Sequence, residues 1–154
     1  MISIERSSTS QKVLFVENVG EDEYETEGIW CSRDGENFVV DNIPFVASRI
    51  SLGDTIKAEY DADEKAFYFD DFVKASGNTT VRLYFQDISI IEDARSKLVE
   101  LGCEGEIFLT RKMLAVNVPY DKEYRPIKKL LDEGEQQGKW TYEESCLAHN
   151  PSGL

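Results

Sequence analysis

The hydrophobic pattern of this sequence changes at residues 76–78, where the residues are Ser-Gly-Asn. Before this point, short apolar runs such as 12–19 follow the two-residue period of β-strands. After it, apolar residues at Ile91, Ala94 and Leu98 follow the spacing of an amphipathic helix. The change predicts an α+β chain whose two parts meet at this seam.

Residues 12–76 are predicted to form a small antiparallel β-barrel or curled sheet, after a flexible lead-in at residues 1–11. Asp34-Gly35 is typical of a tight hairpin turn. The acidic loop at 61–65 separates two strand-like runs and predicts a second hairpin. Aromatic residues of this part are expected to fill the barrel core, namely Trp30, Phe67, Phe69 and Phe72.

Residues 77–146 follow the order β-α-β-β-α-β, which is the order of a ferredoxin-like fold. The helices are expected at residues 91–101 and at about 124–137, with Pro126 in the first turn of the second helix. Residues 147–154 are expected to form a frayed tail. Strands are predicted at 79–86, 104–109, 112–119 and 140–145.

The stretch VVDNIPFVASRISLGD, residues 39–54, is interpreted as a joint rather than a binding site. Pro44 removes a backbone donor and favours extended geometry in the residue before it. The closing Gly-Asp pair is expected to turn the chain into the next strand. Phe45 and Val46 are expected to plug the barrel.

Groups that carry enzymatic chemistry are scarce. The single histidine, His149, lies near the C-terminus, and no catalytic triad can be built around it. Cys31, Cys103 and Cys146 lack CxxC spacing and are expected to be reduced thiols. The acidic runs lack the ligand spacing of a calcium loop. We therefore expect no catalytic residue, no metal site and no cofactor, and we do not expect an enzyme.

Charge narrows the class of partner. The sequence has 30 acidic and 17 basic residues, a formal net charge of −13. Residues 1–76 hold 17 of the acids and 7 of the bases, so the N-terminal half carries most of the negative field. Such a field repels nucleic acid and suits a basic protein surface, or serves solubility alone. With no membrane-length apolar run and no secretory signal, we expect a cytoplasmic protein that binds neither nucleic acid nor membrane.

Acidic and aromatic residues occur together in the N-terminal half and form the candidate partner-binding surface. Aromatic side chains anchor protein interfaces, and charges steer the approach of the partner. Tyr24 lies among five acids between residues 21 and 27, which favours its exposure. The predicted partner-binding residues are Glu21, Asp22, Glu23, Tyr24, Glu25, Glu27, Tyr60, Asp61, Asp63, Glu64, Asp70 and Asp71.

The sequence also resembles a bacterial family known only as a domain of unknown function. The resemblance lies in DNIPFVASRISLGDTIKAEY, with EGIWC before it and LDEGEQQGKWTYEE after it. Members share Asp-Asn-Ile-Pro-Phe, Ser-Leu-Gly-Asp and a Leu-Gly-Cys turn, which is Leu101-Gly102-Cys103 here. The resemblance covers about residues 12–146 and brings no catalytic residues. Proteins of this kind are similar to the small acidic immunity proteins encoded beside bacterial toxins.

These features together predict an immunity protein that binds the catalytic domain of a cognate interbacterial toxin. It would block that domain through the acidic, aromatic surface. The alternative is a small-molecule-binding or regulatory protein-interaction module, with its site in a pocket between the two halves. An enzyme is the third class.

Overall fold

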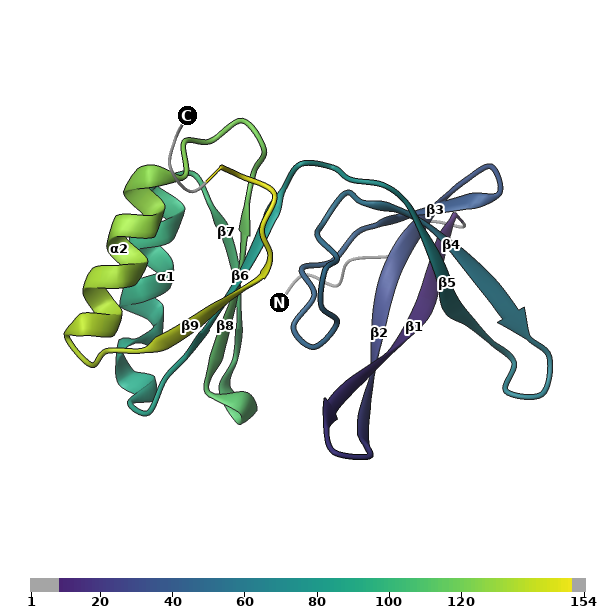
Figure 1. Cartoon of the computed structure of the whole chain (residues 1–154), viewed down its shortest axis with the longest axis horizontal. Coiled ribbons are helices and arrows are strands. Elements are labelled where there is room, and N and C mark those ends of the chain that lie inside the picture. Colours follow the sequence, from purple (N-terminus) through teal and green to yellow (C-terminus); the bar gives the residue numbers. More distant parts are fainter. Residues whose placement is uncertain (1–8, 151–154) are drawn as a thin grey trace.

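The computed structural model describes residues 9–150 and contains a β-barrel beside a second sheet (Figure 1). Two helices cover the face of the second sheet that points away from the barrel. The chain is therefore α+β, as predicted. The remainder of the predicted lead-in and tail, residues 1–8 and 151–154, lies outside the described residues.

Five strands close the barrel in chain order. Neighbouring strands pair antiparallel, and a short parallel contact between the first and last strands closes the ring. This closure confirms the barrel that the two-residue period predicts. The strands are β1 (Ser10–Gly20), β2 (Glu23–Asp34), β3 (Asn37–Val40), β4 (Thr55–Asp61) and β5 (Ala66–Lys74).

Some details of the predicted barrel are wrong. β1 already begins at Ser10, inside the predicted lead-in, because its backbone pairs with β2 from there. Phe67 packs against the core, but Phe69 and Phe72 are 36% and 42% exposed, because they follow the point where β5 stops pairing with β1. Trp30 is half-buried, since it alternates with inward-facing neighbours on β2.

The second sheet has the strand order β7-β8-β6-β9, with every neighbouring pair antiparallel. Its strands are β6 (Thr79–Tyr84), β7 (Glu104–Phe108), β8 (Met113–Val118) and β9 (Thr141–Cys146). Short 3₁₀ turns lie at Ile88–Ile90 and Leu109–Arg111. Chain order places one helix after β6 and the other after β8.

The two helices pack their apolar stripes on this sheet. α1 (Ile91–Glu100) buries Ile91, Ala94 and Leu98, the stripe read from the sequence. Gly102 follows it in the left-handed conformation, with φ of 94°. α2 (Arg125–Gln136) carries its proline in the first turn, where no helical donor is lost. None of the helices among residues 9–150 is long and apolar enough to cross a membrane.

The joint between β3 and β4 packs against the second sheet. Phe45 and Val46 were expected to plug the barrel, but both lie outside its core cluster. The Phe45 ring instead lies 4.1 Å from the Phe108 ring, centroid to centroid, and Ile43 packs with Met113 and its neighbours. The joint and the helices cover opposite faces of the second sheet, so every residue of β8 is buried.

The segment that follows β9 is anchored where it was expected to fray. The His149 ring stacks on Tyr124 with centroids 5.4 Å apart, and Nδ1 lies 2.6 Å from Thr79 Oγ1. Nε2 lies 2.9 Å from the carbonyl oxygen of Pro119, and it must donate because a carbonyl only accepts. The histidine therefore ties the end of the described chain to the second sheet.

Candidate functional site

The turn between β1 and β2 presents the most exposed part of the predicted surface. Glu21, Asp22 and Glu23 are exposed, and the Tyr24 side chain is 64% exposed. Asp22 adopts a left-handed backbone with φ of 55°, which aspartate tolerates better than most residues. We name residues 20–24 the acidic turn.

The hairpin of β4 and β5 carries a second group of predicted residues. Tyr60 is 53% exposed. The carboxylate of Asp61 accepts hydrogen bonds from the backbone amides of Asp63 and Glu64, at 2.9 and 3.1 Å, and so holds the loop in shape. The ends of the two hairpins point in different directions in Figure 1. The fold therefore gives two acidic surfaces instead of the single surface that was predicted.

Glu27 does not belong to a partner-binding surface. Its side chain is 4% exposed and accepts three backbone hydrogen bonds of 2.8–3.0 Å from Phe45, Val46 and Ala47. It shares the inward face of β2 with Ile29, so strand alternation directs it into the molecule. The prediction of Glu27 as a contact residue is wrong, and its role is to fasten the joint to the barrel.

Glu25 is also engaged within the molecule. Its Oε2 lies 2.7 Å from Nη2 of Arg111, which follows β7 in the second sheet. The hydrogen bond from Arg111 to Glu25 raises the pKa of the guanidinium. A partner would have to break this bridge to use Glu25.

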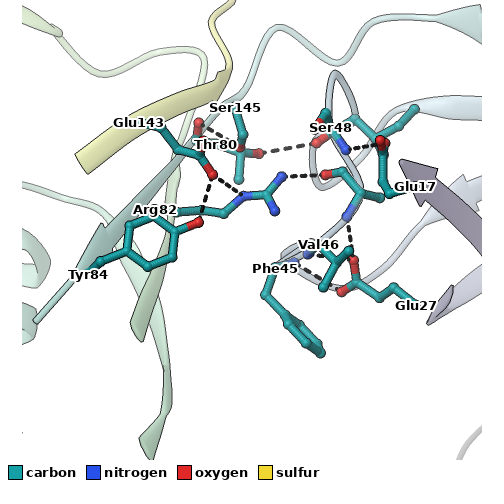
Figure 2. Close-up of polar contacts among 12 residues, drawn as sticks. Glu17, Glu27, Phe45, Val46, Ser48, Thr80, Arg82, Tyr84, Glu143 and Ser145 are labelled. Atoms are coloured by element: carbon teal, nitrogen blue, oxygen red, sulfur yellow. Dashed lines mark hydrogen bonds and ion pairs between the residues drawn. The ribbon is translucent and has the colours of Figure 1, made fainter. Parts of the chain in front are cut away.

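A buried arginine lies between the barrel and the second sheet. It is not among the site residues predicted from the sequence. Arg82 projects from β6 with 3% exposure, and its Nη2 donates to the carbonyl oxygen of Ala47 in the joint (Figure 2). Its Nε is 3.7 Å from Glu143 Oε1. The signal for it was a single charge inside the alternating strand run TTVRLYFQ.

Arg82 borders a polar pocket of about 300 Å³ at this junction. Tyr84 lies at its edge and donates a 2.7 Å hydrogen bond to Glu143. Burial and the neighbouring carboxylate raise the pKa of Tyr84 to about 12, so it is a neutral donor at physiological pH. Glu17, Glu25 and Arg111 complete the charged lining, so the pocket holds both signs and favours no simple ion.

The remaining candidate chemistry is structural. Burial raises the pKa of both the Cys31 and the Cys103 thiols to about 12, which keeps them protonated and unreactive. Among residues 9–150 no three metal-binding side chains come together. Asp70 and Asp71 remain exposed on β5, as a partner surface requires.

Comparison with known proteins places the chain in a family. A family model described as "Domain of unknown function (DUF4265)" matches residues 27–142. The chain belongs to the DUF4265 family. The match spans the joint, Arg82 and both helices, whereas the acidic turn precedes it. Membership of DUF4265 agrees with the resemblance to a domain of unknown function, and it assigns no functional residues.

A solved structure shares the fold of this DUF4265 chain. It is described as a "Novel crystal structure of a hypothetical protein from Neisseria gonorrhoeae". The two are 25% identical with a TM-score of 0.80, over 94% of this chain and 100% of that one. Barrel and second sheet therefore occur together in both proteins. No curated protein matches this DUF4265 chain.

Proposed function

We propose that this DUF4265 chain is a cytoplasmic immunity protein that binds the catalytic domain of a cognate interbacterial toxin and blocks it. The acidic turn is the observation that carries the proposal. It presents three carboxylates beside Tyr24, whose ring is the most exposed aromatic group of the barrel. An exposed aromatic anchor among charges is suited to entering a basic cleft.

The charge of the whole chain supports this choice of partner. A net charge of −13, concentrated in the barrel half, accelerates the approach of a basic protein. Toxin domains that act on nucleic acids or nucleotides commonly present basic clefts. A standard interface covers about 800 Å² per partner, which is less than a tenth of the 9503 Å² surface of the described chain.

The test is co-expression of the chain with the product of its neighbouring gene. We expect that product to stop growth when expressed alone, and this chain to restore growth. Tyr24→Ala should weaken protection, whereas Tyr120→Ala, which removes a 69% exposed tyrosine from the other half, should not. A neighbouring product that is harmless alone, or that stays toxic beside this chain, would contradict the proposal.

A second candidate function is a small-molecule-binding or regulatory module. The polar pocket beside Arg82 and Arg111 favours it, because clefts between structural units are common ligand sites. Its test is a screen of metabolites by thermal melting. A ligand that raises the melting temperature of the native chain, and not that of the Arg111→Ala variant, would support this function.

We also infer that residues 77–146 form a ferredoxin-like unit. The order of elements, β-α-β-β-α-β, supports this inference. So does the antiparallel strand order β7-β8-β6-β9, with both helices on one face. On the opposite face of the sheet, the buried Arg82 bonds to the joint and so connects this unit to the barrel.

A further inference from the structure

The barrel has an apolar groove where β1 and β5 separate. The two strands pair only at Val13 with Phe67 and at Leu14 with Tyr68, and no further pair joins them in the described part of the chain. The groove beyond this point has a volume of about 410 Å³. Its walls are apolar and come from β1, β5 and the joint: Phe15, Val16, Ile50, Phe69 and Phe72.

An irregularity in β5 directs two aromatic side chains into this groove. Lys57 pairs with Asp71 and Ala58 with Phe69, so Asp70 has no partner on β4. An extra residue of this kind shifts the alternation of a strand by one position. Phe72 therefore faces the same side as Phe69, although the two are three positions apart. The groove is a built feature of the barrel, and it leaves both rings more than a third exposed.

The rim of the groove carries one acidic and one basic side chain within the acidic half of the chain. Glu17 and Arg49 line it, whereas Asp71 pairs with Lys57 and so lies on the face of β5 opposite to Phe72. The Glu17 carboxylate accepts a 2.7 Å hydrogen bond from the amide of Ser48, which fixes its position at the edge. The two charges that line the groove are of opposite sign, but residues 1–76 as a whole hold 17 acidic and 7 basic residues, so the field around the rim is negative. This negative charge would repel small apolar acids, whereas it would attract lysine or arginine side chains.

Arg49 is held in place by the second sheet. Its backbone is left-handed with φ of 64°, an uncommon conformation for a residue other than glycine. Its amide donates a 2.9 Å hydrogen bond to the carbonyl oxygen of Ser145 on β9. The joint therefore stays at the end of the groove, and the opening between β1 and β5 does not close over the phenylalanine rings.

We infer that this groove receives one large apolar side chain from a basic segment of a protein partner. Phe69 and Phe72 contact the inserted side chain, Glu17 pairs with a lysine or arginine residue that flanks it, and the negative field of the barrel half attracts the rest of the basic segment. Protein interfaces gain most of their affinity from a few large side chains that are buried in well-packed pockets. The inference rests on the proposed function, for which the groove supplies an anchoring contact on the same barrel as the acidic turn.

The probe is a short capped peptide with one phenylalanine between lysines, titrated into the full chain and followed by backbone amide NMR. We expect saturable shifts at millimolar peptide, centred on Phe15, Ile50 and Phe72. A peptide with alanine in place of phenylalanine, and one with glutamate in place of lysine, should each bind at least about tenfold more weakly. No shifts at these residues, or equal binding of the alanine peptide, would overturn the inference.

Two neighbouring residues give matched variants for the same titration. Phe72 and Val73 are both 42% exposed, but only Phe72 lines the groove. Phe72→Ala should lower the affinity for the lysine peptide about tenfold, and Val73→Ala should lower it less than about twofold. Both variants should melt near the temperature of the native chain. Equal weakening by both variants would overturn the inference. Dodecanoate is a further probe, and its binding in place of the peptide would assign the groove to a small apolar ligand instead.

Failure of the groove and failure of the proposed function can be told apart. If Phe72→Ala protects cells from the neighbouring gene product as well as the native chain does, the groove is not part of the interface and the immunity function stands. If the lysine peptide binds through Phe72 but the chain gives no protection, the groove is supported as a peptide site and the immunity function is contradicted.

Discussion

At the scale of single residues, Glu27 illustrates how one buried carboxylate organises a long connection. Its two oxygens accept three consecutive backbone amides of the joint. A carboxylate that accepts several amide hydrogen bonds compensates the cost of burying its charge. The joint needs such a partner because its backbone, between β3 and β4, has few strand neighbours of its own.

The variant Glu27→Gln tests this role. An amide side chain offers only one acceptor oxygen, so at least one buried amide of the joint loses its partner. We expect a loss of about 1–3 kcal/mol in the free energy of unfolding, measured by urea denaturation. Glu17→Gln, which disturbs a single exposed hydrogen bond, should cost clearly less. Equal stability of Glu27→Gln and the native chain would show that the carboxylate is not needed.

Cys31 and Cys103 give a prediction on pH. Burial raises the pKa of both thiols to about 12, from 9.0 when unfolded. The folded chain thus holds these protons more tightly, so their contribution to stability is complete below pH 9 and is lost as the pH rises towards 12. The urea midpoint should fall across this range, and Cys31→Ala with Cys103→Ala should flatten that fall. An unchanged pH slope in the double variant would contradict the assignment.

At the scale of elements, α2 depends on the absence of a side chain at Gly134. A Cβ atom there would lie 1.9 Å from Cζ2 of Trp140, whose indole nitrogen donates to the carbonyl oxygen of Leu131. The indole ring of Trp140, just before β9, therefore packs directly on the helix backbone at this glycine. This contact fixes the loop that reverses the chain after α2.

Gly134→Ala should destabilise the protein although alanine favours helices by about 1 kcal/mol over glycine. Displacing Trp140 should cost more than this gain, with a net loss of about 1–3 kcal/mol in chemical denaturation. The loss should shrink in a Trp140→Phe background, because the smaller ring leaves room for the methyl group. A stabilising Gly134→Ala would mean that the indole moves aside freely.

Elements were predictable from sequence where apolar periodicity reports burial directly. The stripe on α1 and the strands of the barrel follow from it, because each has one face in a core. Phe45 and Arg82 were not predictable in the same way. Their surroundings are set by the contact between barrel and second sheet, which joins residues far apart in the chain. The candidate site was predicted in part, since exposure of Tyr24 follows from local charge.

At the scale of the whole molecule, the joint and Arg82 connect an acidic barrel to a second sheet that supports it. The barrel half then presents the acidic turn and the apolar groove from fixed positions. A rigid surface loses little entropy on binding, which favours tight inhibition of a partner. We therefore propose that the barrel carries recognition, with the second sheet as its support.

The association rate of the purified chain with the product of its neighbouring gene, measured against salt concentration, tests whether the acidic turn recognises the partner. The variant Glu21→Lys with Glu23→Lys reverses charge in the acidic turn. Asp121→Lys with Glu123→Lys makes the same change on an exposed loop of the other half. We predict that the first pair slows association about tenfold at low salt and weakens its salt dependence, while the second pair changes it less than about twofold. If both pairs slow association equally, or if neither pair slows it, recognition through the acidic turn is contradicted.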